Sequence, residues 1–318
     1  MRIATLACLA SLVATLPAHA LEPPPGFWFH INGKTRVGQM AETPDGLIVV
    51  PAEDENVVRL FTEAGDYVTS FGGIGTELGQ FFKPTGVAID AGGNLYICVQ
   101  SNHRVQKFSP ALAPLFAIGT QGTGPGQLAY PANCALSPDG SRLYVTELGN
   151  DRVSMFTADG GFLGTFGMPG SAPGQLYDPF GIVVEPHTGD VFVSNQSNHR
   201  IDRFTFAGGW RYSIGQQGNG IDDFQYVVGL GLDAGGHLWA ADQVNQRVKK
   251  LTQAGTVLTV WGELGPAEYQ FYNPWSVFIT RAGNIWIGDT YNYRIEVYRY
   301  PTTPAAPATW GGIKTRYR

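Results

Sequence analysis

Residues 101–108 read SNHRVQKF, and residues 197–204 read SNHRIDRF. Two catalytic His–Arg pairs would explain this octapeptide, and so would an internal repeat. Its central triplet, Asn-x-Arg, occurs five times, and the arginines are 48, 48, 47 and 47 residues apart. The five copies are Asn102-His103-Arg104, Asn150-Asp151-Arg152, Asn198-His199-Arg200, Asn245-Gln246-Arg247 and Asn292-Tyr293-Arg294. Spacing this regular indicates a repeat.

Two further columns of residues keep the same phase. A glycine follows an apolar residue at Gly72, Gly119, Gly167, Gly215 and Gly262. A Gly-Gln pair recurs at residues 79–80, 126–127 and 174–175, and Gln270 alone holds this place in the fifth copy. Three columns in phase establish five clear repeat units.

Each unit predicts four short strands. In the first clear copy these are PTGVAID (84–90), LYICV (95–99), VQKF (105–108) and PLFAIG (114–119), with turn residues between them. Four antiparallel strands in ~45 residues are typical of a β-propeller blade. A degenerate unit at 36–72, in which EDENVVR (53–59) replaces Asn-x-Arg, makes six. The predicted fold class is therefore an all-β, six-bladed β-propeller.

The stretch at 84–108, PTGVAIDAGGNLYICVQSNHRVQKF, resembles an NHL repeat, and this resemblance extends over residues 36–312. Known NHL propellers include RNA readers, extracellular binding modules and the peptide α-amidating lyase. The resemblance therefore implies the fold and leaves the function open. Two segments could supply the last strand of the ring, FWFHING at 27–33 and ATWGG at 308–312, and the register favours the second.

The two ends of the chain complete the domain organisation. Residues 1–20 combine Arg2, an apolar run and Ala18-His19-Ala20, which predicts a signal peptide and a periplasmic or extracellular protein. Residues 21–35 form an N-terminal segment, and 313–318 form a tail. Without its leader the chain has 20 basic and 26 acidic residues, which argues against a nucleic-acid partner. We expect no membrane span, and a monomer.

Two cysteines follow the leader, and both lie in apolar strand-like runs. Cys98 is in LYICV and Cys134 is in ANCAL. Free cysteine behaves as a small buried apolar residue, so we expect two buried, unpaired thiols. A Cys98–Cys134 disulfide is the alternative, because the two residues belong to adjacent blades.

The repeated polar residues are expected to be structural. The asparagines (Asn102, Asn150, Asn198, Asn245, Asn292) and the arginines (Arg104, Arg152, Arg200, Arg247, Arg294) are predicted to hydrogen-bond backbone and hold loops in place. The residue between them varies, and we interpret this variation as exposure to solvent. The aromatic residues Phe81, Phe82, Tyr177, Phe224, Phe271 and Tyr272 are interpreted mostly as wedges between blades.

Catalytic and metal-binding patterns are weak. The resemblance to the amidating lyase implies a zinc held by histidines, but our register brings no three of the five histidines beyond the leader together. There is no Gly-x-Ser-x-Gly elbow, HExxH motif or phosphate loop. We therefore predict no cofactor, with Ca²⁺ or Zn²⁺ as the open alternative.

The candidate site consists of positions that depart from the repeat. One column closes the second strand, and a second precedes the first strand. Both should lie near the central opening on the face of the Asn-x-Arg loops. The predicted ligand-binding residues are Tyr130, Glu147, Asp178, Asn195, Tyr226, Asp242 and Asp289. The family usually has aspartate at the end of the second strand, so Asp242 and Asp289 match its pattern.

We interpret the chain as a binding module for a protein, peptide or carbohydrate. A lyase or hydrolase acting at the central opening is the alternative. On this interpretation Glu147→Ala should leave stability nearly unchanged. Arg152→Ala should instead cost about 1–3 kcal/mol.

Overall fold

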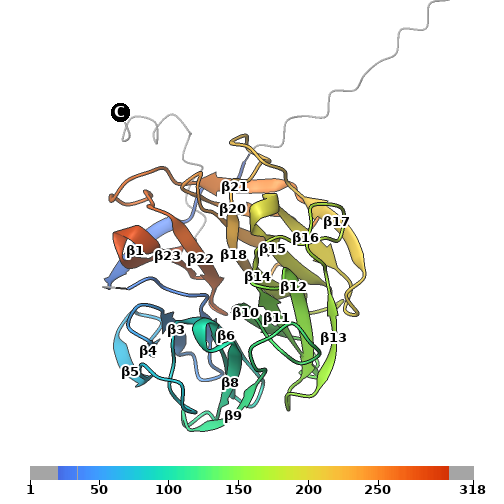
Figure 1. The fold of residues 1–318 in the computed structure, drawn as a ribbon. Coiled ribbons are helices and arrows are strands. Elements are labelled where there is room, and N and C mark those ends of the chain that lie inside the picture. Colours follow the sequence, from blue (N-terminus) through green and yellow to red (C-terminus); the bar gives the residue numbers. More distant parts are fainter. Residues whose placement is uncertain (1–20, 34, 301–318) are drawn as a thin grey trace, which may run out of the picture.

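The computed structural model describes residues 21–33 and 35–300. It forms six four-stranded antiparallel sheets arranged in a ring (Figure 1). The predicted six-bladed propeller is therefore confirmed. Within the described residues there is no α-helix and no helix long and apolar enough to cross a membrane. The predicted leader and tail lie outside these residues.

Each blade takes strands that follow one another in the chain. Blade 1 contains β2 (Ala41–Glu42), β3 (Ile48–Ala52), β4 (Val57–Phe61) and β5 (Tyr67–Gly72). Blade 2 contains β6 (Pro84–Ile89), β7 (Leu95–Val99), β8 (Arg104–Phe108) and β9 (Pro114–Ile118). Blade 3 contains β10 (Pro131–Leu136), β11 (Arg142–Glu147), β12 (Arg152–Thr157) and β13 (Phe162–Phe166). Blade 4 contains β14 (Pro179–Val184), β15 (Val191–Asn195), β16 (Arg200–Phe204) and β17 (Trp210–Ile214). Blade 5 contains β18 (Val227–Leu232), β19 (Leu238–Asp242), β20 (Arg247–Leu251) and β21 (Val257–Trp261). Blade 6 contains β22 (Pro274–Ile279), β23 (Ile285–Asp289), β24 (Arg294–Arg299) and β1 (Gly26–Asn32).

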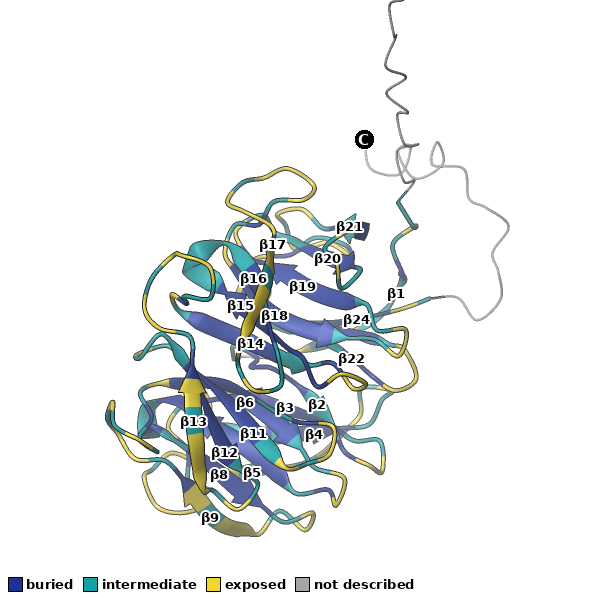
Figure 2. Ribbon diagram, turned by 90° about the vertical axis from the view of Figure 1, so that its right-hand side faces the viewer, coloured by how far each residue is buried: buried dark blue, intermediate teal, exposed yellow. Residues whose placement is uncertain are grey.

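The first strand of each blade lies nearest the axis, and the fourth lies at the rim (Figure 1). The second strands are buried on both faces, whereas β9, β13 and β17 are largely exposed (Figure 2). The decrease in burial from the second strand to the fourth follows from the packing of blades against one another, because a middle strand has a neighbouring blade on each side. The Asn-x-Arg turns lie on one face of the ring, which we call the loop face. The turns between first and second strands form the opposite turn face.

The ring is closed by the N-terminal strand. β1 pairs antiparallel with β24, from Gly26 opposite Arg299 to Asn32 opposite Arg294. Phe29 and Ile31 add apolar surface between blades 6 and 1. The preference for residues 308–312 as the closing strand is therefore wrong, because β1 occupies that place. Residues 308–312 lie outside the described part of the chain.

The repeated glycines are explained by the packing between blades. Each has a positive φ, and a Cβ there would lie 2.3–2.7 Å from a wedge side chain that is 0% exposed. The pairs are Gly72–Phe81, Gly119–Leu128, Gly167–Leu176, Gly215–Phe224 and Gly262–Phe271. Only glycine accepts both the backbone conformation and the contact.

The two cysteines are free and buried, as the sequence predicted. They lie in one apolar cluster between blades 2 and 3. Cys134 Sγ donates to the Tyr96 carbonyl at 3.3 Å, and burial raises the pKa of Cys98.

Candidate functional site

The Asn-x-Arg motif holds the connection that enters its own blade. Each asparagine Nδ2 donates to a glycine carbonyl in that connection, at 2.8–3.0 Å. The acceptors for Asn102, Asn150, Asn198, Asn245 and Asn292 are Gly75, Gly122, Gly170, Gly218 and Gly265. The predicted structural role of these asparagines is confirmed.

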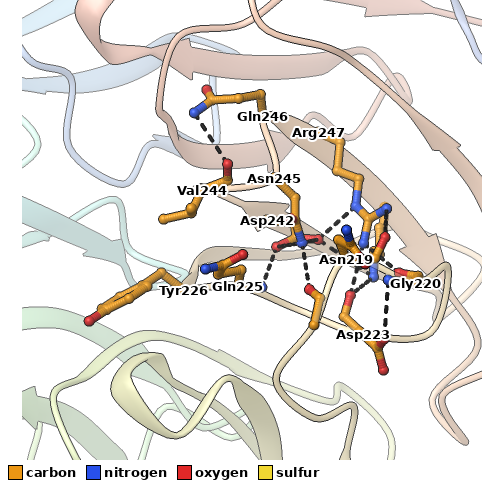
Figure 3. A network of polar contacts seen from close by, with 12 residues as sticks. Asn219, Gly220, Asp223, Gln225, Tyr226, Asp242, Val244, Asn245, Gln246 and Arg247 are labelled. Atoms are coloured by element: carbon orange, nitrogen blue, oxygen red, sulfur yellow. Dashed lines mark hydrogen bonds and ion pairs between the residues drawn. The ribbon is translucent and has the colours of Figure 1, made fainter.

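The arginines bind the same connections through several carbonyls at once. In blade 5, Arg247 donates from Nη1 to the Asn219 carbonyl at 3.1 Å and from Nη2 to those of Gly220 and Asp223 at 2.6 and 3.0 Å (Figure 3). Arg152, Arg200 and Arg294 make equivalent bonds, and Arg104 makes one, to the Glu77 carbonyl at 2.7 Å. The predicted role of the arginines is confirmed as well.

The column that closes the second strand is buried. Glu147, Asn195, Asp242 and Asp289 are each 0% exposed. Asp242, for example, accepts from the Gln225 N–H at 2.7 Å, Asn245 Nδ2 at 3.0 Å and Arg247 Nε at 2.7 Å (Figure 3). The prediction that these four residues line the central opening is therefore wrong. They complete the arginine anchor inside each blade.

The departure in blade 4 is compensated nearby, whereas the departure in blade 2 is not. In blade 4 Asn195 replaces the carboxylate, and Asp202 on the next strand binds Arg200 Nε at 2.9 Å. Asn195 Nδ2 also donates to Asp202 at 2.6 Å. In blade 2 Val99 supplies no acceptor, so Arg104 Nε is buried without a partner in the described part of the chain. Burial lowers the pKa of Arg104.

The prediction that the middle residue of the motif faces solvent holds for Tyr293, which is 47% exposed. It is wrong for the other four copies, in which this residue links its blade to the next one. The Tyr130 N–H donates to His103 Nδ1 at 3.1 Å, and His103 is 8% exposed. The equivalent links join Lys83 to Asn56, Asp178 to Asp151, Tyr226 to His199 and Asn273 to Gln246, at 2.6–3.1 Å. All ten residues have a positive φ. Burial lowers the pKa of His103 and His199, which keeps both rings neutral acceptors.

Three members of the second predicted column, Tyr130, Asp178 and Tyr226, lie on the loop face. Tyr130 packs edge-on against His103 and Tyr226 against His199, with ring centroids 4.4 and 4.9 Å apart. Asp178 accepts from Ser197 Oγ at 2.7 Å. The loop face therefore holds its tyrosines in fixed orientations.

A cavity of about 220 Å³ opens at the axis on this face, and we call it the loop-face cavity. Its floor contains Phe180 and Trp275, whose rings meet edge-on at 5.0 Å. Its walls include Lys83, Gln100, Tyr130, Leu148, Gly149 and Gln196, so blades 2, 3, 4 and 6 meet here. Of the seven predicted binding residues, only Tyr130 lines this cavity.

The sequence interpretation missed a column of which three members, Gln100, Leu148 and Gln196, line the cavity. It lies one residue after the buried column and reads Glu53, Gln100, Leu148, Gln196, Gln243 and Thr290. The side-chain amides of Gln100, Gln196 and Gln243 have no partner among the described residues. Three glutamines at equivalent positions of a repeat were the signal that could have identified it.

Exposed aromatic side chains lie on the loop face, and one of them, Tyr130, lines the cavity. Phe82, Tyr177 and Tyr272 directly precede the positive-φ residues and are 47–53% exposed, so their assignment as wedges is wrong. Phe81, Phe224 and Phe271 are fully buried wedges, as predicted. Together with Tyr130, Tyr226, Tyr291 and Tyr293, the exposed residues form a set that we call the aromatic rim.

Within residues 21–33 and 35–300, no group of three or more His, Cys, Asp and Glu side chains is placed to hold a metal ion. His187 and His237 lie in turn-face turns, where their Nδ1 atoms contact Glu185 and Asp233 at 2.9 and 3.1 Å. Neither is near the loop-face cavity. The described histidines therefore serve local structure.

Glu53 belongs to the same column as the glutamines and carries the one carboxyl of that column. It is 2% exposed, and no described residue is a hydrogen-bond partner of its Oε1. Burial raises its pKa to about 7, although the charges of Lys83 and Arg36 act in the opposite direction.

Glu53 should make stability depend on pH. The folded chain keeps this proton between the ordinary pKa of 4.5 and about 7, so its stabilising contribution is lost as pH rises through that range. Urea unfolding should show that Glu53→Gln removes up to ~3 kcal/mol of this pH dependence. Glu77→Gln, at an exposed carboxyl, is the control; equal pH profiles for Glu53→Gln and wild type would contradict the assignment.

The fold and the cavity place this protein among six-bladed β-propellers with a cavity at the mouth of the central channel. Residues 81–108, which span the end of a connection and three strands of blade 2, match the family described as NHL repeat. The protein is thus a six-bladed β-propeller in which this segment of blade 2 matches an NHL repeat.

Three similar proteins illustrate the range of this fold. The chain is 36% identical over 70 residues to the protein brain tumor of Drosophila melanogaster, which covers 22% of this chain and only 7% of that protein. An auxiliary nutrient binding protein from Bacteroides ovatus is 16% identical, with a TM-score of 0.63 over 83% of this chain and 69% of that one. A catalytically inactive virginiamycin B lyase from Staphylococcus aureus, solved with quinupristin, is also 16% identical, with a TM-score of 0.58 over 88% and 90%. The likenesses to the two solved structures, each at 16% identity, show a shared fold alone.

Proposed function

We propose that this protein is an exported binding protein that takes a peptide segment of a partner at the loop-face cavity and the aromatic rim. The observation that carries the proposal is the pair of carboxamides, Gln100 and Gln196, which line the cavity above Trp275 and Phe180. A carboxamide offers one acceptor and two donors, which matches the alternating N–H and C=O groups of a peptide backbone.

The aromatic rim supports the same proposal. Tyrosine presents a large apolar area and a polar tip at a low cost in conformational entropy, and it is enriched where proteins bind other proteins. The rim rings are exposed by 37–53%, and two of them rest on histidine rings. A rim that is already oriented loses little freedom on binding. The likeness to a nutrient binding protein is consistent with a binding role.

The alternative is a lyase or hydrolase, and one observation favours it. A glutamate that titrates near pH 7, as Glu53 does, suits general acid–base catalysis. Glu53 is buried, however, and is not among the residues that line the cavity. For this reason we place binding ahead of turnover.

Selection from a displayed library of random linear peptides tests the proposal. We expect enriched peptides whose affinity falls about tenfold or more in Tyr130→Ala and in Gln196→Leu, because each replacement removes contact at the centre of the site. Tyr67→Ala is the matched control, since Tyr67 is 58% exposed on β5, an outermost strand of the propeller that is not part of the aromatic rim.

Two results would contradict this function. One is the absence of any enriched peptide together with saturable binding of a glycan at the same residues. The other is a set of enriched peptides that bind Tyr130→Ala and wild type equally.

A further inference from the structure

Among the described residues that line the loop-face cavity, Lys83 alone carries a charged side chain. It directly precedes β6 of blade 2, at the position that Tyr130 occupies in blade 3. Its backbone is fixed, since its φ is positive and its N–H donates to Asn56 Oδ1 of blade 1 at 2.9 Å. The root of this side chain is therefore held at the cavity, and only its flexible stem can move.

The ammonium group of Lys83 is unpaired. Its Nζ makes no hydrogen bond or ion pair with a residue in the described part of the chain, and it remains accessible in a half-buried side chain. Burial raises the pKa of Glu53 in blade 1 to about 7, against the opposing charge of Lys83. Below that pH Glu53 keeps its proton and does not neutralise Lys83. Arg36, at the equivalent position of blade 1, is already paired with Asp54 at 2.8 Å.

This positive charge stands in an acidic protein, whose formal net charge is −5 at pH 7. Asp178 occupies the equivalent position of blade 4, where it accepts from Ser197 Oγ at 2.7 Å, and it does not line the cavity. A cation that is partly withdrawn from water and has no partner gains from a bound anion. The cavity therefore favours a ligand with a negative group.

The floor of the loop-face cavity is closed. Phe180 is 1% exposed and belongs to one apolar cluster with Ala132 and Val228, both 0% exposed. A peptide chain cannot pass through this cluster, so only the end of a chain or a single side chain enters the cavity. The volume of about 220 Å³ lies below the usual ~300–1,000 Å³ of small-molecule sites, which leaves room for about one residue.

We propose that the group bound deepest in the loop-face cavity is a carboxylate of the peptide, and that Lys83 is the residue that selects it. This inference rests on the proposed function and names the chemistry that the site recognises. The Lys83 ammonium would donate to the carboxylate, with the carboxamides of Gln100 and Gln196 as further donors. An apolar side chain of the same peptide would lie against Trp275. The carboxylate belongs either to the C-terminal residue or to an acidic side chain, and the experiment separates these two sources.

Three capped probes, titrated into the full chain and followed by calorimetry, test the inference. N-acetylphenylalanine has a C-terminal carboxylate, its amide has none, and N-acetyl-aspartyl-phenylalanine amide has a side-chain carboxylate. We expect at least one of the two acids to bind about tenfold or more tightly than N-acetylphenylalanine amide, because hydrogen bonds to charged groups are stronger than those between neutral groups. The acid that does so identifies the source of the carboxylate. The preference should decrease as the salt concentration rises.

Variants of Lys83 assign this preference to its charge. Lys83→Met should remove the preference for the acid, since it keeps an unbranched stem and loses the charge, whereas Lys83→Arg should retain most of it. Arg299→Met is the matched control, because Arg299 is exposed at the turn-face end of β24. This control removes the same charge and should leave the preference unchanged. Melting temperatures show whether each variant is folded.

Three results would overturn the inference. In the first, acids and amide bind equally and Tyr130→Ala weakens them all; the peptide site then stands but does not select a carboxylate. In the second, the preference for the acid persists in Lys83→Met, which assigns it to another group. In the third, no probe saturates; the carboxylate inference then fails, and the peptides enriched from the library decide the proposed function on their own.

Discussion

Replacing Glu147 by alanine should lower the free energy of unfolding by about 3–5 kcal/mol, because it removes one partner of a buried ion pair. Glu147 is 0% exposed and accepts from Arg152 Nε at 2.7 Å, the Ala129 N–H at 2.9 Å and Ser154 Oγ at 2.6 Å. Without the carboxylate, Arg152 Nε and two further donors lose their acceptor inside the blade. Urea unfolding of the variant and the wild type measures the difference.

This expectation reverses the one drawn from the sequence, in which Glu147 was a replaceable surface residue. Asp159→Ala is the control in the same blade, since Asp159 is exposed in the turn before β13. Glu147→Gln should fall between the two, because it keeps acceptors but removes the charge. If Glu147→Ala stays within ~0.5 kcal/mol of wild type, as a surface change would, the buried anchor does not stabilise the blade.

Removing the closing strand should have an even larger effect. A chain that begins at residue 35 lacks β1, which exposes the backbone groups of β24 along a full edge and uncovers the apolar surface that Phe29 and Ile31 share with blades 6 and 1. It also loses the bond from the Phe27 N–H to the Tyr269 hydroxyl, 2.8 Å long. We expect loss of the cooperative thermal transition and association of the chains through the open edge.

The matched control is a chain that ends at Tyr300. Because β1 already fills the fourth place in blade 6, this chain should melt within a few degrees of the full protein. Circular dichroism and size-exclusion chromatography measure both. The opposite result would contradict β1 as the closing strand: the chain that ends at Tyr300 would lose cooperative melting, and the chain that begins at residue 35 would keep it.

The sequence predicted the blades because their requirements are met by residue identity. Only glycine fits at Gly119, and only an arginine fork reaches several carbonyls from the place of Arg247. The middle position of Asn-x-Arg was misread for the opposite reason. In four of the five copies it is a left-handed residue that supplies an acceptor atom, and histidine, aspartate and glutamine all have one. Variation among these four reflects chemical equivalence, and only Tyr293 is exposed.

The candidate site was only partly predictable for a related reason. Glu147 is buried because its blade packs against the connection that enters it, which includes Ala129. The residue pattern of one strand does not contain this information. Asn195 stands where the neighbouring blades have a carboxylate, and this replacement is explained only by Asp202, which supplies the carboxylate from the adjacent strand. The recurring glutamines were visible in the sequence, but the lining of one cavity by Gln100 and Gln196 became evident only when the ring was closed in three dimensions.

Closure by β1 also dictates an order of events during folding. The segment at 26–32 is the earliest part of the propeller to leave the ribosome, yet its pairing partner, residues 294–299, is among the last. The first strand must therefore stay unpaired while five blades are completed, and the longest-range contact in the protein forms at the end. Contacts so distant along the chain are slow to form. On the export proposed above, this order suits passage across a membrane, since the ring closes only when its last strand is available.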